Sequence, residues 1–127
     1  MTRSVLVVDD AAFMRMLLRD ILSTGGYDVH EAVDGDDAIS RYFELLPDVV
    51  TMDVTMPGRD GIEAVAAIVQ GDPSARVIVV SALGEQAIVR SALDAGAFGY
   101  LVKPFQPDNV LALVQGALET RSVGAGG

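Results

Sequence analysis

Short apolar runs alternate along the chain with longer segments in which apolar residues recur every three or four positions. Runs rich in Val and Ile occur at 5–8, 49–52 and 77–80, and weaker runs occur at 28–33 and 99–102. Continuous apolar runs are typical of strands that are covered on both faces. The pattern therefore predicts five strands, each followed by a helical segment.

The segments between the runs carry the apolar stripes of amphipathic helices. The clearest stripes are Met14, Leu17, Leu18, Ile21 and Leu22; Ile39, Tyr42, Phe43 and Leu46; Ile62, Val65, Ala66 and Val69; and Val110, Leu113, Val114 and Ala117. A fourth helix is expected within 85–95, where the pattern is Ala-rich and weaker. Glycines follow three of the helical segments, at Gly25, Gly71 and Gly96, and such glycines commonly end helices.

The order of five strand–helix units predicts an α/β domain with a parallel sheet and right-handed crossovers. We see no internal linker, so residues 1–119 are interpreted as one domain. Residues 120–127 are small and rich in Gly, and we expect them to form a flexible C-terminal tail.

Composition narrows the possible partners and the compartment. The chain of 127 residues has 9 basic and 18 acidic side chains, a net charge of −9, which disfavours unaided binding to nucleic acid or an anionic membrane. It has no cysteine, and no apolar stretch approaches the roughly 20 residues of a membrane helix. We therefore expect a soluble cytoplasmic protein. A monomer is a separate expectation. Lys103 is its single lysine.

Four of the five predicted strands end in a group suited to phosphate or metal chemistry. Asp9 and Asp10 follow the first strand, Asp53 the third, Ser81 the fourth and Lys103 the fifth. Ligands of open parallel sheets bind beyond the carboxyl ends of the strands. If the first and third strands are neighbours, the three aspartates converge and repel one another unless a cation binds, and oxygen ligands suit Mg²⁺.

Each of these residues also has an ordinary structural interpretation. Aspartate often shapes the turn after a strand, serine often caps a helix, and lysine is usually a solvated surface residue. The interpretation as a functional site therefore depends on the whole set lying at matching strand ends.

Together, these residues make the chain resemble the receiver domains of response regulators, over roughly Ser4 to Leu118. The resemblance is carried by the pair Asp9-Asp10, the segment 52–61 around Asp53, Ser81-Ala82 and Lys103-Pro104-Phe105. Residues 9–14 and 103–107 are most similar to the chemotaxis branch of the family. The resemblance implies a (βα)5 flavodoxin-like three-layer sandwich, with a five-stranded parallel sheet of order 2-1-3-4-5.

The resemblance also implies a role for each site residue. Asp53 would accept a phosphoryl group from a histidine kinase, and Lys103 would contact that group. Asp10, Asp53 and the backbone carbonyl of Thr55 would bind Mg²⁺ directly, for which Mn²⁺ could substitute, while Asp9 would act through water.

Further expectations concern the switch and its partners. Ser81 would hydrogen-bond the phosphoryl group, Tyr100 would then turn inward, and the Lys103–Pro104 bond would be cis. The face built by the fourth helix, fifth strand and fifth helix would then bind a target, expected to be the flagellar motor switch. The kinase would be of the chemotaxis type and a phosphatase would be a further partner. The protein would be a single-domain phosphoacceptor that catalyses its own phosphorylation and dephosphorylation rather than an enzyme in the usual sense.

Three other functions use related folds or related chemistry. A small haloacid-dehalogenase-like phosphatase needs a second aspartate two residues after its nucleophile, where this chain has Thr55. A flavin mononucleotide binder needs a phosphate loop after the first strand, where the acidic pair would repel an anion. A phosphorelay receiver, which passes the phosphoryl group to a histidine phosphotransfer protein, uses the same residues and stays open as the alternative.

Overall fold

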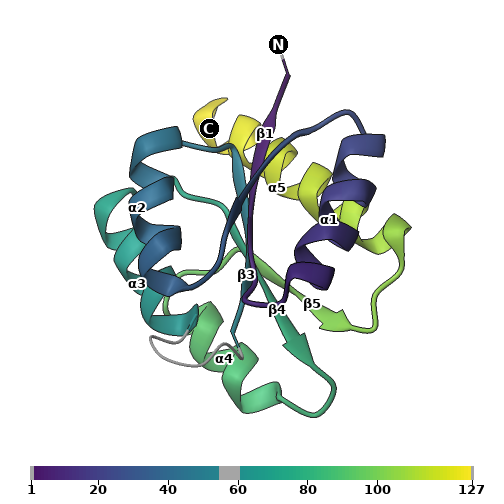
Figure 1. Ribbon diagram of the computed structural model, residues 1–127. Helices are drawn as coiled ribbons and strands as arrows, with labels where there is room; N and C mark the ends of the chain where they lie inside the picture. Colours follow the sequence, from purple (N-terminus) through teal and green to yellow (C-terminus); the bar gives the residue numbers. More distant parts are fainter. Residues whose placement is uncertain (1, 55–60, 127) are drawn as a thin grey trace.

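The computed structural model describes residues 2–54 and 61–126, with side chains described as far as 119. Five strands and five helices alternate through these residues (Figure 1). Their bounds are β1 Ser4–Val8, α1 Ala12–Thr24, β2 Asp28–Ala32, α2 Gly35–Leu45, β3 Val49–Asp53, α3 Gly61–Gly71, β4 Val77–Ala82, α4 Gln86–Asp94, β5 Gly99–Lys103 and α5 Pro107–Gly126. The predicted element order is therefore confirmed.

The strands form one parallel sheet in the order β2-β1-β3-β4-β5. The predicted strand order is thus confirmed, with β1 and β3 as neighbours. Val8 is aligned with Met52 in the β1–β3 pair, and Asp53 with Val80 in the β3–β4 pair. Because all five strands run in the same direction, their carboxyl ends lie along one edge of the sheet, and Asp9, Asp53, Ser81 and Lys103 all lie at this edge.

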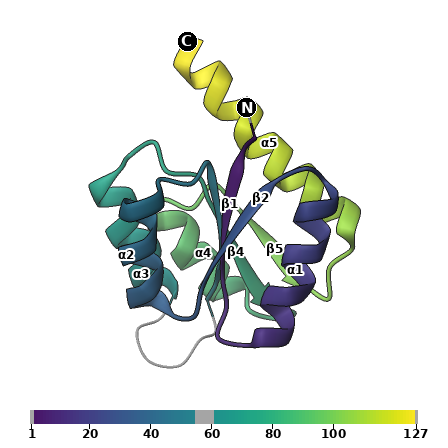
Figure 2. The same ribbon diagram turned by 45° about the horizontal axis from the view of Figure 1, so that its top comes forward.

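Helices cover both faces of the sheet, which gives the predicted three layers (Figure 2). Alternate side chains of β1 divide between the two cores: Leu6 and Val8 pack with α2 and α3, and Val5 and Val7 pack with α1 and α5. The buried aliphatic runs seen in the sequence belong to strands that are covered on both sides. No helix within residues 2–54 and 61–126 has the length and apolar character required to cross a bilayer.

Three residues of the predicted apolar stripes were placed wrongly. Leu17, Phe43 and Leu46 are exposed, whereas their neighbours Leu18 and Tyr42 are buried. Leu46 follows the last residue of α2 and has a positive φ of 48°, so it ends the helix in the left-handed conformation and its side chain leaves the apolar face. Helix α5 continues through most of the segment expected to be a tail; the domain boundary at 119 and the tail's flexibility stay predictions.

Candidate functional site

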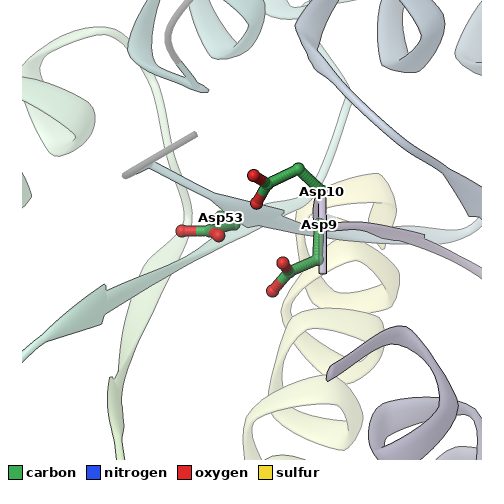
Figure 3. A group of neighbouring side chains, drawn as sticks. All are labelled: Asp9, Asp10 and Asp53. Carbon is green, nitrogen blue, oxygen red and sulfur yellow. The ribbon is translucent and has the colours of Figure 1, made fainter. Parts of the chain in front are cut away.

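Three carboxylates converge at the carboxyl edge of the sheet, from the ends of β1 and β3. Asp9, Asp10 and Asp53 each offer an oxygen, and these oxygens all lie within 4.8 Å of one another (Figure 3). Asp9 and Asp53 are 2% and 3% exposed, whereas Asp10 lies at the exposed mouth of the site. The sequence predicted that these three residues would meet if β1 and β3 were neighbours.

The buried position of Asp9 has an electrostatic consequence. Burial raises the pKa of the Asp9 carboxyl above its ordinary value, and the charges of Asp53 and Asp10 add to this effect. The hydrogen bond from Ala11 N–H to Asp9 Oδ1, 2.9 Å long, and the charge of Lys103 act in the opposite direction on this pKa. Net negative charge is therefore held in a place where it is disfavoured, a condition that a bound cation relieves.

Lys103, the single lysine, lies in this cluster. Its Nζ is 3.7 Å from Asp9 Oδ2 and 3.7 Å from Asp53 Oδ2. It is the last residue of β5, aligned with Ala82 across the β4–β5 pair. The following Lys103–Pro104 peptide bond is cis. The ammonium group is thus within reach of any anion that approaches Asp53.

Ser81 lies near the end of β4, and its hydroxyl stands out among the buried polar groups. Its side chain is buried, and Oγ has no hydrogen-bond partner among the described residues. A buried hydroxyl without a partner carries a desolvation cost of about 1–3 kcal/mol. The main-chain N–H of the next residue, Ala82, donates to Glu85 Oε1 over 2.6 Å.

Tyr100 lies on the outer side of β5 and is half exposed. A cavity of about 770 Å³ runs from Ser81 past Leu83, Val89 and Arg90 to Tyr100. Ser81 and Tyr100, which are 19 positions apart in sequence, therefore share the lining of one cavity between β4, α4 and β5. Thr55, whose backbone carbonyl is the remaining predicted metal ligand, lies outside the described residues.

Sequence reasoning missed two side chains that hold the main chain at this edge. Arg15, in the first turn of α1, donates from Nη1 to the backbone carbonyl of Asp9 over 2.9 Å. Glu85, just before α4, accepts the N–H of Ala82. In both hydrogen bonds one partner is a main-chain group. The residue types in the sequence therefore do not indicate which side chain would form the bond.

The residues present fit a divalent cation of the Mg²⁺ type. They supply clustered carboxylate oxygens, two of the three from buried side chains, and the charge balance at Asp9 is unfavourable without a cation.

Comparisons with known proteins agree with this geometry. The profile of the response regulator receiver domain matches residues 5–115. The chain is 54% identical to the chemotaxis protein CheY of Thermotoga maritima over 87% of this chain and 93% of that protein. It is 50% identical to CheY of Bacillus subtilis, over 93% of this chain and 99% of that protein.

Solved structures show the same likeness. A putative response regulator from Chloroflexus aurantiacus superposes with a TM-score of 0.89 at 29% identity, covering 94% of this chain and 99% of that one. NtrX from Brucella abortus superposes with a TM-score of 0.93 at 31% identity over 98% of this chain, which spans 29% of that longer chain. The chain therefore belongs to the response regulator receiver domain family, as a CheY-like member.

Proposed function

We propose that this protein is a phosphorylation switch in which Asp53 accepts a phosphoryl group from a histidine kinase. The observation that carries the proposal is the position of Lys103 Nζ, 3.7 Å from Asp53 Oδ2, beside a cluster of three carboxylates. A buried aspartate next to a compact positive charge suits the transfer of a phosphoryl group, in which positioning and neutralisation of charge dominate. Membership of the CheY-like group supports two-component signalling in chemotaxis as the setting.

The transfer forms one bond and breaks one. A carboxylate oxygen of Asp53 attacks the phosphorus of a phosphohistidine, and the bond from phosphorus to the imidazole nitrogen breaks. The electron pair of that bond stays on the nitrogen, which is reprotonated on the kinase, and Asp53 becomes an acyl phosphate. Hydrolysis by water later returns the Asp53 carboxylate and inorganic phosphate.

The remaining site residues have distinct parts in this step. Mg²⁺, when bound, supplies positive charge that lowers the repulsion between the carboxylates and the phosphoryl oxygens. Lys103 holds one phosphoryl oxygen as a point charge. Asp10 and Asp53 would hold the cation directly, and Asp9 would hold it through water. Ser81 Oγ, which lacks a partner among the described residues, donates to another phosphoryl oxygen. Thr55, outside the described residues, offers its carbonyl to the cation.

The switch follows from the shared cavity. When Ser81 turns its hydroxyl toward the phosphoryl group, the cavity lined by Ser81 and Tyr100 changes shape at one end. The half-exposed Tyr100 ring then moves inward, and the face formed by α4, β5 and α5 is altered. A target that binds this altered face more tightly shifts the population toward it.

The partners follow from the chemotaxis relatives. We propose a CheA-like histidine kinase as donor, a flagellar motor switch protein as target and a phosphatase that shortens the signal, all in the cytoplasm. The protein would act as a monomer without nucleic acid or membrane. It would catalyse its own phosphorylation and dephosphorylation rather than turn over a separate substrate.

Two measurements test the proposal. Intact-mass analysis after incubation with Mg²⁺ and a small phosphodonor should show the addition of one phosphoryl group, which Asp53→Asn abolishes; undiminished labelling of the variant would exclude Asp53. Titration with a peptide from the motor switch should then show tighter binding of the phosphorylated protein. If full phosphorylation leaves that affinity unchanged, and the phosphoryl group passes to a histidine phosphotransfer protein instead, the protein is a phosphorelay receiver.

A further inference from the structure

Arg15 links the acidic site to the second strand through two hydrogen bonds of one guanidinium group. Its Nη1 donates to the backbone carbonyl of Asp9 over 2.9 Å, and its Nε donates to Glu31 Oε1 over 2.9 Å. The side chain is 17% exposed, so this contact is partly removed from solvent. The planar fork of a guanidinium fixes the directions of both donors, which a lysine ammonium does not.

Glu31 is itself held in place from a second side. Arg19 Nε donates to Glu31 Oε2 over 2.6 Å, so the two carboxylate oxygens are shared between two arginines of α1. The hydrogen bond from Arg19, followed by that from Arg15, lowers the pKa of the Glu31 carboxyl below its ordinary value. Glu31 lies on β2 and is aligned with Val7 of β1. Val7 precedes Asp9 by two residues. It therefore anchors Arg15 to the rigid sheet.

The turn that Arg15 reaches has little other side-chain support. Ala11 occupies the cap position of α1 and has no side-chain oxygen to bond the first turn of the helix. Asp9 Oδ1 accepts the N–H of Ala11 instead, which engages a carboxylate oxygen of the acidic cluster. Arg15 restrains the main chain of Asp9 without using any carboxylate oxygen of the acidic cluster.

The carbonyl that Arg15 holds belongs to the peptide group that joins Asp9 to Asp10. Because that group is planar, the direction of its carbonyl also sets the direction in which the Asp10 main chain leaves the strand. The N–H of Asp9 is bonded to Ala32 O over 3.2 Å, so Asp9 is held by β2 on its amino side and by Arg15 on its carboxyl side.

We propose that Arg15 is a positioning residue, which orients the Asp9–Asp10 peptide group and thereby two of the three carboxylates of the proposed cation site. The inference rests on the proposed function, since it assigns Arg15 to the same site. A positioning role and a pure charge effect predict opposite changes in Mg²⁺ affinity when Arg15 is replaced. A positive charge near a cation site repels the cation, so its removal alone would tighten Mg²⁺ binding, whereas loss of positioning weakens it.

The chain supplies a matched control. Arg19 has the same charge, lies on the same helix and bonds the same Glu31, but no hydrogen bond to Asp9 is described for it. Arg15→Met and Arg19→Met therefore remove equal charge and one partner of Glu31 each, and differ in the bond to the Asp9 carbonyl. Arg15→Lys keeps the charge but cannot make both bonds of the fork.

The test is the dissociation constant of Mg²⁺ alone, measured by calorimetry on the full chain at fixed pH and ionic strength. Replacing a group that orients metal ligands typically weakens metal binding by about 10–100-fold. Because Arg15 acts on the main chain, we expect Arg15→Met to weaken Mg²⁺ binding by about tenfold, the lower end of that range. Arg15→Lys should weaken Mg²⁺ binding less. Arg19→Met should change the dissociation constant less than about twofold. Circular dichroism checks that each variant is folded. If Arg15→Met is not folded, the Mg²⁺ affinity of Arg15→Lys is compared with that of the wild type instead.

Binding by Arg15→Met that equals or exceeds that of the wild type would overturn the inference, as would an equal loss in Arg19→Met. Labelling of the same proteins by a small phosphodonor separates this failure from failure of the proposed function. If wild-type protein is not labelled at Asp53, the proposed function falls whatever the Mg²⁺ affinities are. If it is labelled and the Arg15 variants bind Mg²⁺ normally, only the role of Arg15 falls.

Discussion

Lys103 Nζ lies 3.7 Å from Asp53 Oδ2 and the same distance from Asp9 Oδ2, so one ammonium group serves the ends of β1 and β3 from the end of β5. A lysine ammonium is a compact point charge on a flexible stem, whereas arginine presents a wider planar fork. The other eight basic residues of the chain are arginines, which makes the choice of lysine here informative.

Lys103→Arg is expected to keep phosphorylation of Asp53 but to lose most of its coupling to the target face. The guanidinium retains the charge, while its bulk prevents the close approach to the phosphoryl oxygen that the proposed role of Lys103 requires. Parallel measurement of labelling and of target affinity checks this. Lys103→Met, which removes the charge, should label far more slowly. Normal target binding by phosphorylated Lys103→Arg would contradict the expected role.

Ser81→Ala is expected to stabilise the unphosphorylated protein while impairing phosphoryl transfer. The variant removes a buried hydroxyl that has no partner among the described residues, whose cost is about 1–3 kcal/mol. Denaturant unfolding should therefore show a higher free energy of unfolding, and phosphodonor labelling a slower rate. Ser81→Thr, which keeps the hydroxyl, is the control and should label normally. A destabilised Ser81→Ala would mean that Oγ is satisfied by bound water.

Asp9→Asn is expected to raise the stability of the metal-free protein at neutral pH. The pKa of Asp9 is raised in the folded state, chiefly by burial, so its ionised form opposes folding. This opposition is present above the folded pKa and disappears as the pH falls through that value. The unfolding free energy of Asp9→Asn should thus exceed that of the wild type at pH 7, and the difference should shrink on acidification. Urea unfolding in the presence of a chelator that removes Mg²⁺ measures this difference.

Addition of Mg²⁺ should reverse that order. A ligand present at about 100 times its dissociation constant stabilises the folded state by roughly 2.7 kcal/mol, which the wild type should gain and Asp9→Asn should gain only in part. If Mg²⁺ stabilises both proteins equally, Asp9 takes no part in holding the cation.

Gly61→Ala is expected to disturb the site through the backbone of Asp53 and Val54. A Cβ at this position, the first of α3, would lie 2.8 Å from Val54 Cα and would also contact the backbone oxygen of Asp53. Backbone atoms cannot yield as a flexible side chain does, so we expect a loss of about 1–3 kcal/mol in unfolding free energy together with slower labelling of Asp53. Gly116→Ala, inside α5 with nothing within 4 Å of the added Cβ, is the control: it should leave labelling unchanged and should not lower the free energy of unfolding, because alanine is a better helix former than glycine.

The sequence predicted the fold and the convergence of the site because both follow from simple rules. Buried strands read as apolar runs, and parallel strands bring their carboxyl ends to one edge, so the positions of Asp53 and Lys103 could be reasoned out once the strand order was imported from the family. The exposure of Leu17 and Phe43 could not be predicted in this way. An apolar residue at the flank of a helical stripe satisfies the periodicity whether or not a neighbouring helix covers it.

The contacts of Arg15 illustrate the other limit. Its partners are a main-chain carbonyl six positions before it, just after β1, and a glutamate sixteen positions after it, on β2. Local periodicity carries no information on such a pair, and the hydrogen-bonding potential of a main-chain carbonyl is the same at every position. Only the three-dimensional arrangement of α1 over β1 and β2 brings the three groups together.

Chemical trapping of the acyl phosphate shows whether Asp53 is the phosphoacceptor. Wild-type protein incubated with Mg²⁺ and a small phosphodonor is treated with borohydride, which reduces an aspartyl phosphate to homoserine, and the peptides are sequenced by mass spectrometry. We expect homoserine at position 53 and unmodified aspartate at positions 9 and 10. Homoserine at position 9 or 10, or at none of the three in protein that carries a phosphoryl group, would contradict this expectation.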